Sequence, residues 1–260
     1  MHIDQQKCVA CGNCIPVCPM GAISVDSVKN RAVVNADECV ECYTCFRGMS
    51  MEKLNPMLVR GIRGVLKAFR LRFDPEPDVC PTSAITPDEL VWPRVVRRAF
   101  SDPIVSHEST GVHGRGTEEV KTNDVTNRVG IGEVGYVVEF GRPTVGVRFR
   151  DIEKMTLALS EMGIQFEPKN PVTHLMTDRN TGKLRDDVLN EKILSAIVEF
   201  KTSIDNVPAV LRRVDEVSKT LDTVVAVGVS TRCDDDGQSD LDGVLAEEGF
   251  SFARGKTNLG

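Results

Sequence analysis

Eight of the nine cysteines fall in roughly the first third of the chain, at spacings that suit metal ligation. The first run reads C-x2-C-x2-C-x3-C-P, and the second reads C-x2-C-x2-C, followed after a long insertion by a Cys-Pro pair. The cysteines are Cys8, Cys11, Cys14, Cys18, Cys39, Cys42, Cys45 and Cys80. Two-residue gaps let one tight loop direct three thiolates at a polynuclear metal centre, and a fourth must come from elsewhere. Proline after that fourth cysteine prevents a helix from continuing and turns the chain.

This spacing resembles that of the bacterial ferredoxins with two 4Fe-4S clusters, in which the fourth cysteine of each run ligates the other cluster. The resemblance covers residues 1–90 and implies two 4Fe-4S clusters as cofactors. The family's crossed pattern assigns Cys8, Cys11, Cys14 and Cys80 to one cluster. It assigns Cys39, Cys42, Cys45 and Cys18 to the other.

An internal duplication supports this interpretation, because Cys-Val-Ala-Cys at 8–11 is matched by Cys-Val-Glu-Cys at 39–42. Two other kinds of cysteine site fit less well. Zinc sites usually pair C-x2-C units across a longer stretch. Disulfides need an oxidising compartment, and the polar start of the chain gives no sign of a secretory signal.

The composition predicts a soluble protein of two domains. The chain has 260 residues and a net charge of −6, which argues against general nucleic-acid binding. No apolar run approaches the roughly 20 residues of a membrane span. We therefore expect a cytoplasmic protein that neither spans a membrane nor binds nucleic acid.

The insertion between Cys45 and Cys80 predicts a helix over residues 55–74. Asn55 suits the N-cap, Pro56 the first helical position, and Pro75 the end. One face carries Leu58, Ile62, Val65, Leu66, Phe69 and Phe73, and the other carries Arg60, Arg63, Lys67 and Arg70. We expect the apolar face to pack within the chain. Docking of a partner and attachment to a membrane surface are the alternatives.

The rest of the N-terminal region predicts a hairpin over residues 22–34 and, over residues 91–128, a linker or extended loop. His107 and His113 lie in that linker without nearby ligand-type residues and receive no role. The run Gly130-Ile131-Gly132-Glu133-Val134-Gly135 matches G-x-G-x-x-G, but a strand-like segment follows it. A turn into a strand fits this context better than a dinucleotide site.

Residues 129–231 repeat a pattern of strand, loop, helix and strand, which predicts a βαββαβ ferredoxin-like domain. The first helix is expected to open at Asp151 as N-cap and end at Gly163, with a strand then running from Ile164 through Val172 to Met176. The second helix is expected to start near Pro208. The fold class is therefore α+β: a dicluster ferredoxin domain with a helical insertion, followed by this domain.

The pattern around 138–143 and 151–166 also resembles that of ACT-type regulatory domains. The resemblance implies an effector site or oligomerisation through this domain, and an assembly surface alone is the other interpretation. Residues 232–260 form a polar tail expected to lie on a neighbouring surface. Asp234, Asp235 and Asp236 lack the spacing and final Glu of a calcium loop, and Cys233 is expected to be a free thiol.

The resemblance implies an electron-transfer protein, as the ferredoxin-like subunit of a multi-subunit oxidoreductase complex in anaerobic metabolism. Its partners would be redox proteins or catalytic subunits. No nucleophile–base pattern occurs, so we assign no catalytic residues. The alternative is a redox- or effector-sensing regulatory protein, and a third hypothesis is an enzyme that binds a nucleotide at the glycine run.

Overall fold

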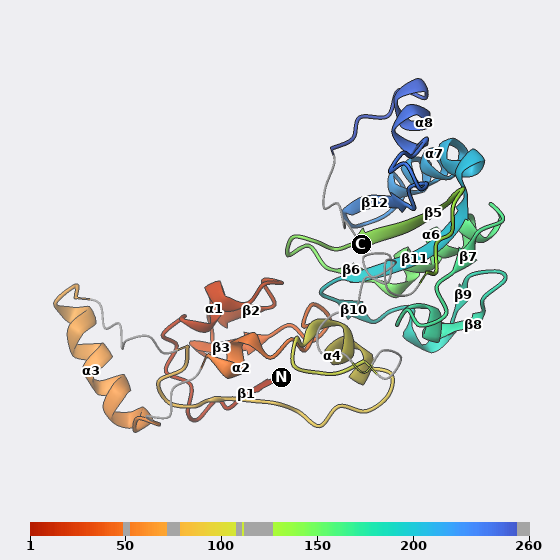
Figure 1. Cartoon of the computed structure of the whole chain (residues 1–260). Coiled ribbons are helices and arrows are strands. Elements are labelled where there is room, and N and C mark those ends of the chain that lie inside the picture. The colour runs from red at the N-terminus through yellow and green to blue at the C-terminus, as the bar shows by residue number, and fades with distance from the viewer. Residues whose placement is uncertain (49–52, 72–78, 108–110, 112–126, 254–260) are drawn as a thin grey trace. The chain divides into compact units, whose positions relative to one another are not determined.

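The computed structural model describes residues 1–48, 53–71, 79–107, 111 and 127–253. The chain divides into two compact units, Met1–Arg98 and Ala99–Gly260 (Figure 1). Within the described part of the chain, no helix is both long and apolar enough to cross a membrane.

The N-terminal unit is built from short elements around the cysteine loops. They are β1 (His2–Ile3), α1 (Cys14–Val17), β2 (Ile23–Asp26), β3 (Arg31–Val34), α2 (Thr44–Arg47), α3 (Pro56–Ala68), β4 (Ile85–Thr86) and the start of α4 (Val95–Ser101). Strands β2 and β3 form the predicted antiparallel hairpin, and β1 pairs antiparallel with β4. The latter pairing places Ile3 opposite Ile85, which brings the segment after Cys80 back to the start of the chain.

Helix α3 begins where the sequence predicts. The Asn55 side chain accepts hydrogen bonds from the backbone N–H groups of Met57 (2.9 Å) and Leu58 (3.4 Å), and Pro56 follows it. The helix ends earlier than expected, at Ala68. Arg70 adopts a left-handed conformation (φ 56°), and the Leu71 N–H reaches back to the Leu66 carbonyl at 2.8 Å. This is a Schellman ending formed without glycine. Phe73 and Pro75 lie outside the described residues.

The expected packing of α3 was wrong. Its apolar side chains are open to solvent: Leu58 is 64% exposed, Val65 59% and Phe69 72%, whereas Val59 is only 2% exposed. The basic side instead faces the first cysteine loop. Backbone carbonyls in that loop need donors, and guanidinium groups can supply several at once.

Helix α4 lies inside the segment expected to be linker. The compact N-terminal unit accordingly extends to Arg98, past the expected domain end at residue 90. Residues 108–110 and 112–126 of the expected linker, which include His113, lie outside the described part of the chain.

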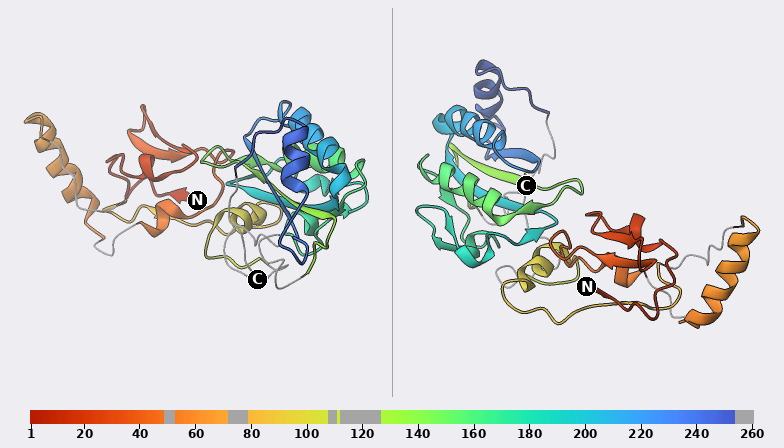
Figure 2. Two further views of the ribbon diagram at one scale, coloured as in Figure 1. Left: turned by 45° about the horizontal axis from the view of Figure 1, so that its top comes forward. Right: turned by 180° about the vertical axis from the view of Figure 1, so that it is seen from behind.

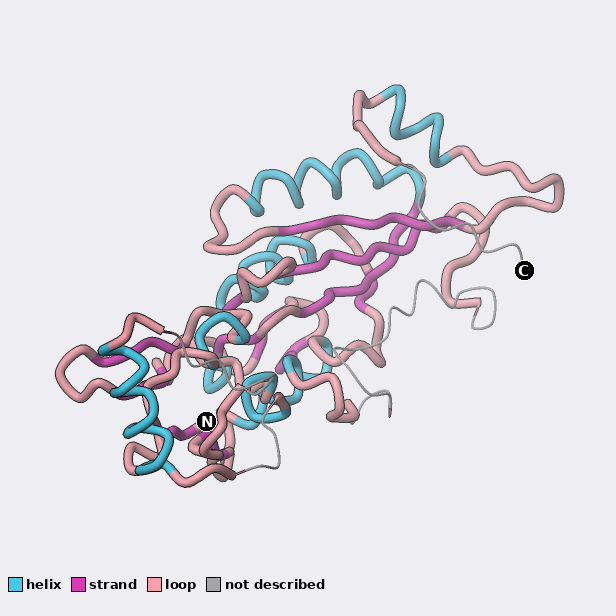
Figure 3. Tube along the Cα trace, turned by 90° about the vertical axis from the view of Figure 1, so that its left-hand side faces the viewer, coloured by secondary structure: helices cyan, strands magenta, loops and turns pink. Residues whose placement is uncertain are grey.

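The C-terminal unit has the predicted βαββαβ order. Its main elements are β5 (Glu133–Phe140), α6 (Phe149–Ser160), β7 (Gln165–Phe166), β11 (Ala196–Ser203), α7 (Val207–Ser218) and β12 (Val225–Thr231). They form an antiparallel sheet of strand order β12-β5-β11-β7, with the long strands side by side (Figure 3). The central pair, β5 and β11, is in register from Phe140 opposite Ala196 to Glu133 opposite Ser203.

The core of this unit is built from alternate residues of the central strands, because successive side chains of a strand point to opposite faces of the sheet. Tyr136 and Phe200 are cross-strand partners whose rings stack at 4.6 Å, and Phe140 and Val138 on the same face are fully buried. Helices α6 and α7 pack against each other and bury apolar stripes that include Ile152.

Three local expectations for this unit need correction. Strand β7 ends at Phe166, because prolines at 168 and 171 interrupt any strand toward Met176. Helix α6 starts at Phe149, so Asp151 lies in its first turn and accepts a hydrogen bond from Lys154 at 2.8 Å. The helix also ends at Ser160, before Gly163.

Several short elements join these main ones. They are β6 (Val147–Arg148), β8 (Met176–Asp178), β9 (Lys183–Leu184), β10 (Lys192–Ile193) and the 3-10 turns at Thr173–Leu175, Asp186–Val188 and Ile204–Asn206. The long first loop of the sequence pattern leads into β6, which pairs with β10.

The described part of the polar tail packs on its own chain. Helix α8 (Leu241–Glu247) buries Leu241 and Leu245 and lies beside α7 (Figure 2). An ion pair joins Arg212 of α7 to Glu248. The described part of the tail therefore packs on the C-terminal unit itself.

Because the C-terminal unit has its own core, we expect it to fold without iron. A fragment of residues 99–260 should show a single cooperative thermal transition by circular dichroism. Replacing Phe140 by Ala should lower its free energy of unfolding by about 3–5 kcal/mol. A fragment that binds hydrophobic dyes and melts without a transition would contradict this.

The exposed face of α3 gives a second prediction. Ile62→Asp and Phe69→Asp should each change the stability of the N-terminal unit by about 0.5 kcal/mol or less, because both side chains already meet water. Val59→Asp on the same helix should be strongly destabilising, since it buries an unpaired charge. Thermal melting and iron retention measure both, and equal damage from all three changes would show that the apolar face is covered.

Candidate metal centre

The eight cysteines of the N-terminal unit influence one another in two groups. Burial raises the pKa of the Cys14 thiol, and the nearby Cys11, Cys8 and Cys80 raise it further. Burial and the nearby Cys42, Cys39 and Cys18 raise the pKa of the Cys45 thiol in the same way. Each group thus holds three cysteines of one loop and a fourth from the other half of the duplication. These memberships are those of the crossed pattern, and the ligand assignment itself stays a prediction.

The two loops share one backbone conformation. In the first, Ala10 and Gly12 have positive φ values of 54° and 83°. In the second, the equivalent Glu41 and Tyr43 have φ values of 55° and 60°. The left-handed residues on both sides of the second cysteine curl each loop in the same way. Outside glycine this conformation is uncommon, which indicates that the loop shape overrides local preference.

Backbone N–H groups point at several of the sulfur atoms. Ala22 donates to Cys18 Sγ at 3.3 Å, and the equivalent Ala84 donates to Cys80 Sγ at 3.1 Å. A third donor, Ala32 of the hairpin, lies 3.3 Å from Cys8 Sγ. N–H donors of this kind stabilise thiolates and tune the cluster that the thiolates hold.

The environment of the thiols fits a cluster rather than an exposed reactive cysteine. Burial raises the pKa of Cys14 to about 12 and that of Cys45 to about 12, and neighbouring cysteines add to both shifts. Burial likewise raises the pKa of Cys39 to about 11. Without iron these groups are neutral thiols, and iron binding must displace their protons. All nine cysteines are free rather than paired in disulfides.

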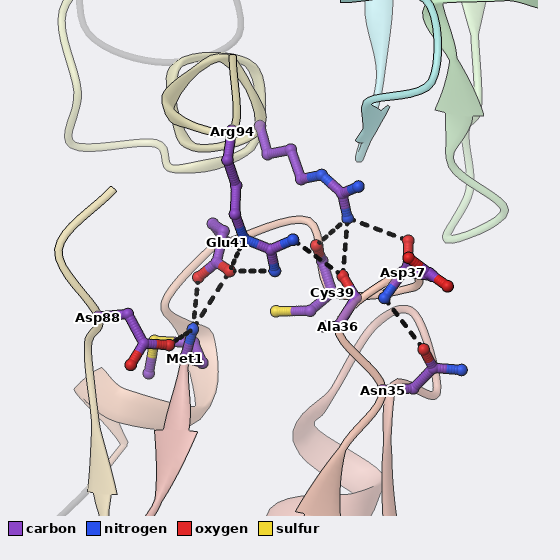
Figure 4. A network of polar contacts seen from close by, with 9 residues as sticks. Met1, Asn35, Ala36, Asp37, Cys39, Glu41, Asp88 and Arg94 are labelled. Carbon is purple, nitrogen blue, oxygen red and sulfur yellow. Dashed lines mark hydrogen bonds and ion pairs between the residues drawn. The ribbon is translucent and has the colours of Figure 1, made fainter. Parts of the chain in front are cut away.

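A polar network braces the second loop (Figure 4). Glu41, fully buried between Cys39 and Cys42, accepts hydrogen bonds from the Met1 amino group at 2.9 Å and from Arg94 at 2.6 Å. Asp88 pairs with the same amino group at 2.8 Å. The network ties the cysteine loop to β1 and to the residue just before α4.

Arginines also hold the outer side of each loop. Arg97 donates to the carbonyl of Cys39 at 2.8 Å, and Arg60 of α3 donates to the equivalent carbonyl of Cys8 at 3.1 Å. Arg63 reaches the Ala10 carbonyl at 3.4 Å. The sequence analysis missed Glu41, Arg94 and Arg97. The available signals were an acid inside a cysteine loop and two arginines three residues apart.

The other motifs of the sequence do not join this site. Gly132 (φ 77°) makes the predicted turn into β5, where a dinucleotide site would need a helix. His107 is buried with its ring against Phe100 at 5.1 Å. Asp234 caps a local turn through Asp236 and Gln238, and Cys233 is exposed.

Comparison with known proteins places the match on the N-terminal segment. Residues 1–48 match the family described as a 4Fe-4S dicluster domain. Ferredoxin-1 of Rhodobacter capsulatus is 50% identical over 42 residues, which is 16% of this chain and 62% of the relative. The ferredoxin-like proteins in the vnf region of Azotobacter chroococcum mcd 1 and Azotobacter vinelandii are 45% and 43% identical over the same shares.

The chain thus spans about three fifths of the length of the curated relatives it matches. No solved structure matches the chain. Residues 1–48 are thus similar to ferredoxin-like dicluster domains, and their cysteines are consistent with two 4Fe-4S clusters. The family match ends before Cys80, so the place of that cysteine depends on the tertiary grouping alone.

The two groups make a prediction about Cys80 and Cys18. Cys80→Ser should damage the cluster of Cys8, Cys11 and Cys14 and leave the other comparatively intact, whereas Cys18→Ser should do the reverse. Iron content and the electron paramagnetic resonance (EPR) spectrum of the reduced protein measure the loss. Cys233→Ser is the matched control and should change neither. Loss of the Cys39 group's cluster in Cys80→Ser would show that ligation is not crossed.

Proposed function

We propose that the chain is an electron carrier that accepts and donates single electrons at two 4Fe-4S clusters. The observation that carries this proposal is the pair of four-thiol groups within a dicluster domain. When bound, each cluster supplies a one-electron redox centre. The ligands proposed for one are Cys8, Cys11, Cys14 and Cys80, and for the other Cys39, Cys42, Cys45 and Cys18.

The chain's own residues suit this role. The buried loops limit the access of water, and the N–H donors to sulfur favour the negatively charged thiolates. In each group at least one cysteine is only half-buried, Cys11 in one and Cys18 and Cys39 in the other. Electrons would therefore enter and leave near these positions. A reducing compartment is part of the proposal, because free thiols must escape oxidation before iron binds.

The finer proposal is a ferredoxin-like subunit of a multi-subunit oxidoreductase in anaerobic metabolism. Its support is indirect. The C-terminal unit adds a second folded body to a dicluster domain, and α3 presents an apolar face beside the first cysteine loop. Both features suit assembly with redox partner proteins.

A regulatory function is the second candidate, with the C-terminal unit acting as an ACT-like effector or assembly domain. A pocket along β7 favours it, because basic residues line this pocket near the buried Glu199. Two of those cations already pair within the chain, Lys201 with Glu133 at 2.8 Å and Arg128 with Glu167 at 3.6 Å. An anionic effector would have to compete with these carboxylates, so we rank this candidate second.

Anaerobic reconstitution tests the electron-carrier proposal. We expect about eight irons per chain, four for each of two cubanes. Protein reduced with dithionite and freed of excess reductant should deliver two electrons per chain to oxidised cytochrome c, used as a probe acceptor. A variant with Cys8→Ser and Cys39→Ser is the control and should deliver none. About one metal per chain, or clusters that cannot be reduced reversibly, would refute the proposal.

A further inference from the structure

The two cysteine loops are held by arginines that come from outside the duplicated core. The carbonyl of Cys39 accepts a hydrogen bond from Arg97 of α4, and the equivalent carbonyl of Cys8 accepts one from Arg60 of α3. A guanidinium group stays positively charged at all relevant pH values. Each therefore places a permanent positive charge beside the backbone of a proposed cluster ligand.

The two arginines differ in burial. Arg97 is 4% exposed, and its Nη1 donates to three carbonyl oxygens: Cys39 at 2.8 Å, Ala36 at 2.9 Å and Asp37 at 3.0 Å. Arg60 is only half-buried. A charge interaction is about four times stronger at an effective dielectric constant of about 20 than in bulk water. The charge of Arg97 should therefore act more strongly on its loop than that of Arg60.

Carboxylates also flank this loop, and the half-buried Glu38 directly precedes Cys39. Glu41 places a carboxylate in the same loop, but Arg94 and the Met1 amino group bind it directly. Asp37 is exposed, as is the side chain of Asp88, which is 51% exposed and pairs with Met1. Two further cations, Arg47 and Arg98, lie over the Tyr43 ring at 6.0 and 4.4 Å.

We propose that Arg97 is a positioning residue that raises the reduction potential of the cluster held by Cys39, Cys42, Cys45 and Cys18. Reduction adds one negative charge to the cluster. A nearby buried cation stabilises the reduced state more than the oxidised state, and this raises the potential. This inference rests on the proposed ligand sets.

The test is a redox titration of the loaded protein, followed by EPR. The two reduction steps are assigned through the hyperfine-shifted NMR signals of the cysteine β protons. Arg97→Gln should move the second-loop cluster to lower potential and shift the first-loop cluster less. Arg97→Lys keeps the charge and should stay closer to the wild type. Lys29→Gln, which removes an exposed charge from the hairpin turn, is the matched control and should move neither.

Arg97→His keeps the test decisive if the glutamine variant fails to load its clusters. When loaded at low pH its imidazole is charged, as arginine is. The potential of the second-loop cluster should fall as the pH is raised through the histidine pKa, while the wild-type potential stays flat over the same range. An unchanged potential in Arg97→Gln, or a potential in Arg97→His that equals the wild-type value at every pH, would overturn the inference.

These measurements separate two kinds of failure. Iron content near one metal per chain would refute the clusters and the proposed function. Two intact clusters whose reduction potentials do not change when Arg97 is substituted would refute only the role of Arg97. A larger shift in the first-loop cluster than in the second would likewise contradict the role of Arg97, because this residue contacts the second loop.

Discussion

The N-terminal unit depends on the need to bring four thiols together at each of two places. One loop of this spacing supplies three, so each group borrows its fourth cysteine from the other half of the duplication: Cys80 joins the first loop and Cys18 the second. The β1–β4 pairing follows from the same need, because it returns the chain after Cys80 to its beginning. Each group therefore draws on both halves of the duplication.

Because the cysteine loops occupy the interior of the N-terminal unit, it has only a small hydrophobic core. The buried cluster of residues in this unit is built around cysteines, with Ile3, Ile23 and Ile85 among its few large aliphatic members. The tight loops also turn carbonyl groups outward, and these need donors. Helices α3 and α4 meet that need with arginines, which explains why the basic side of an amphipathic helix faces inward. Polar satisfaction of the loops outweighs burial of the apolar face of α3.

The C-terminal unit is stabilised by a different principle. Its central strands bury alternate apolar residues over long, regular ladders, and α6 and α7 pack against each other. Tyr136 and Phe200 stack within this core, and α8 adds a further layer on α7. No thiol takes part, since Cys233 is exposed. One chain therefore joins a unit organised by metal ligands to a unit organised by hydrophobic packing.

The sequence by itself determined the order of elements and named the cysteines proposed as ligands, because cysteine spacing, proline position and hydrophobic period are local properties. The hairpin, the Asn55 cap and the βαββαβ order were all predicted from such local patterns. Only the tertiary structure decided which face of α3 turns inward, that α4 belongs to the cluster unit, and that Glu41, Arg94 and Arg97 brace the second loop. Those outcomes depend on contacts of backbone carbonyls and buried charges with residues far away in the sequence. Local sequence patterns do not predict such long-range contacts.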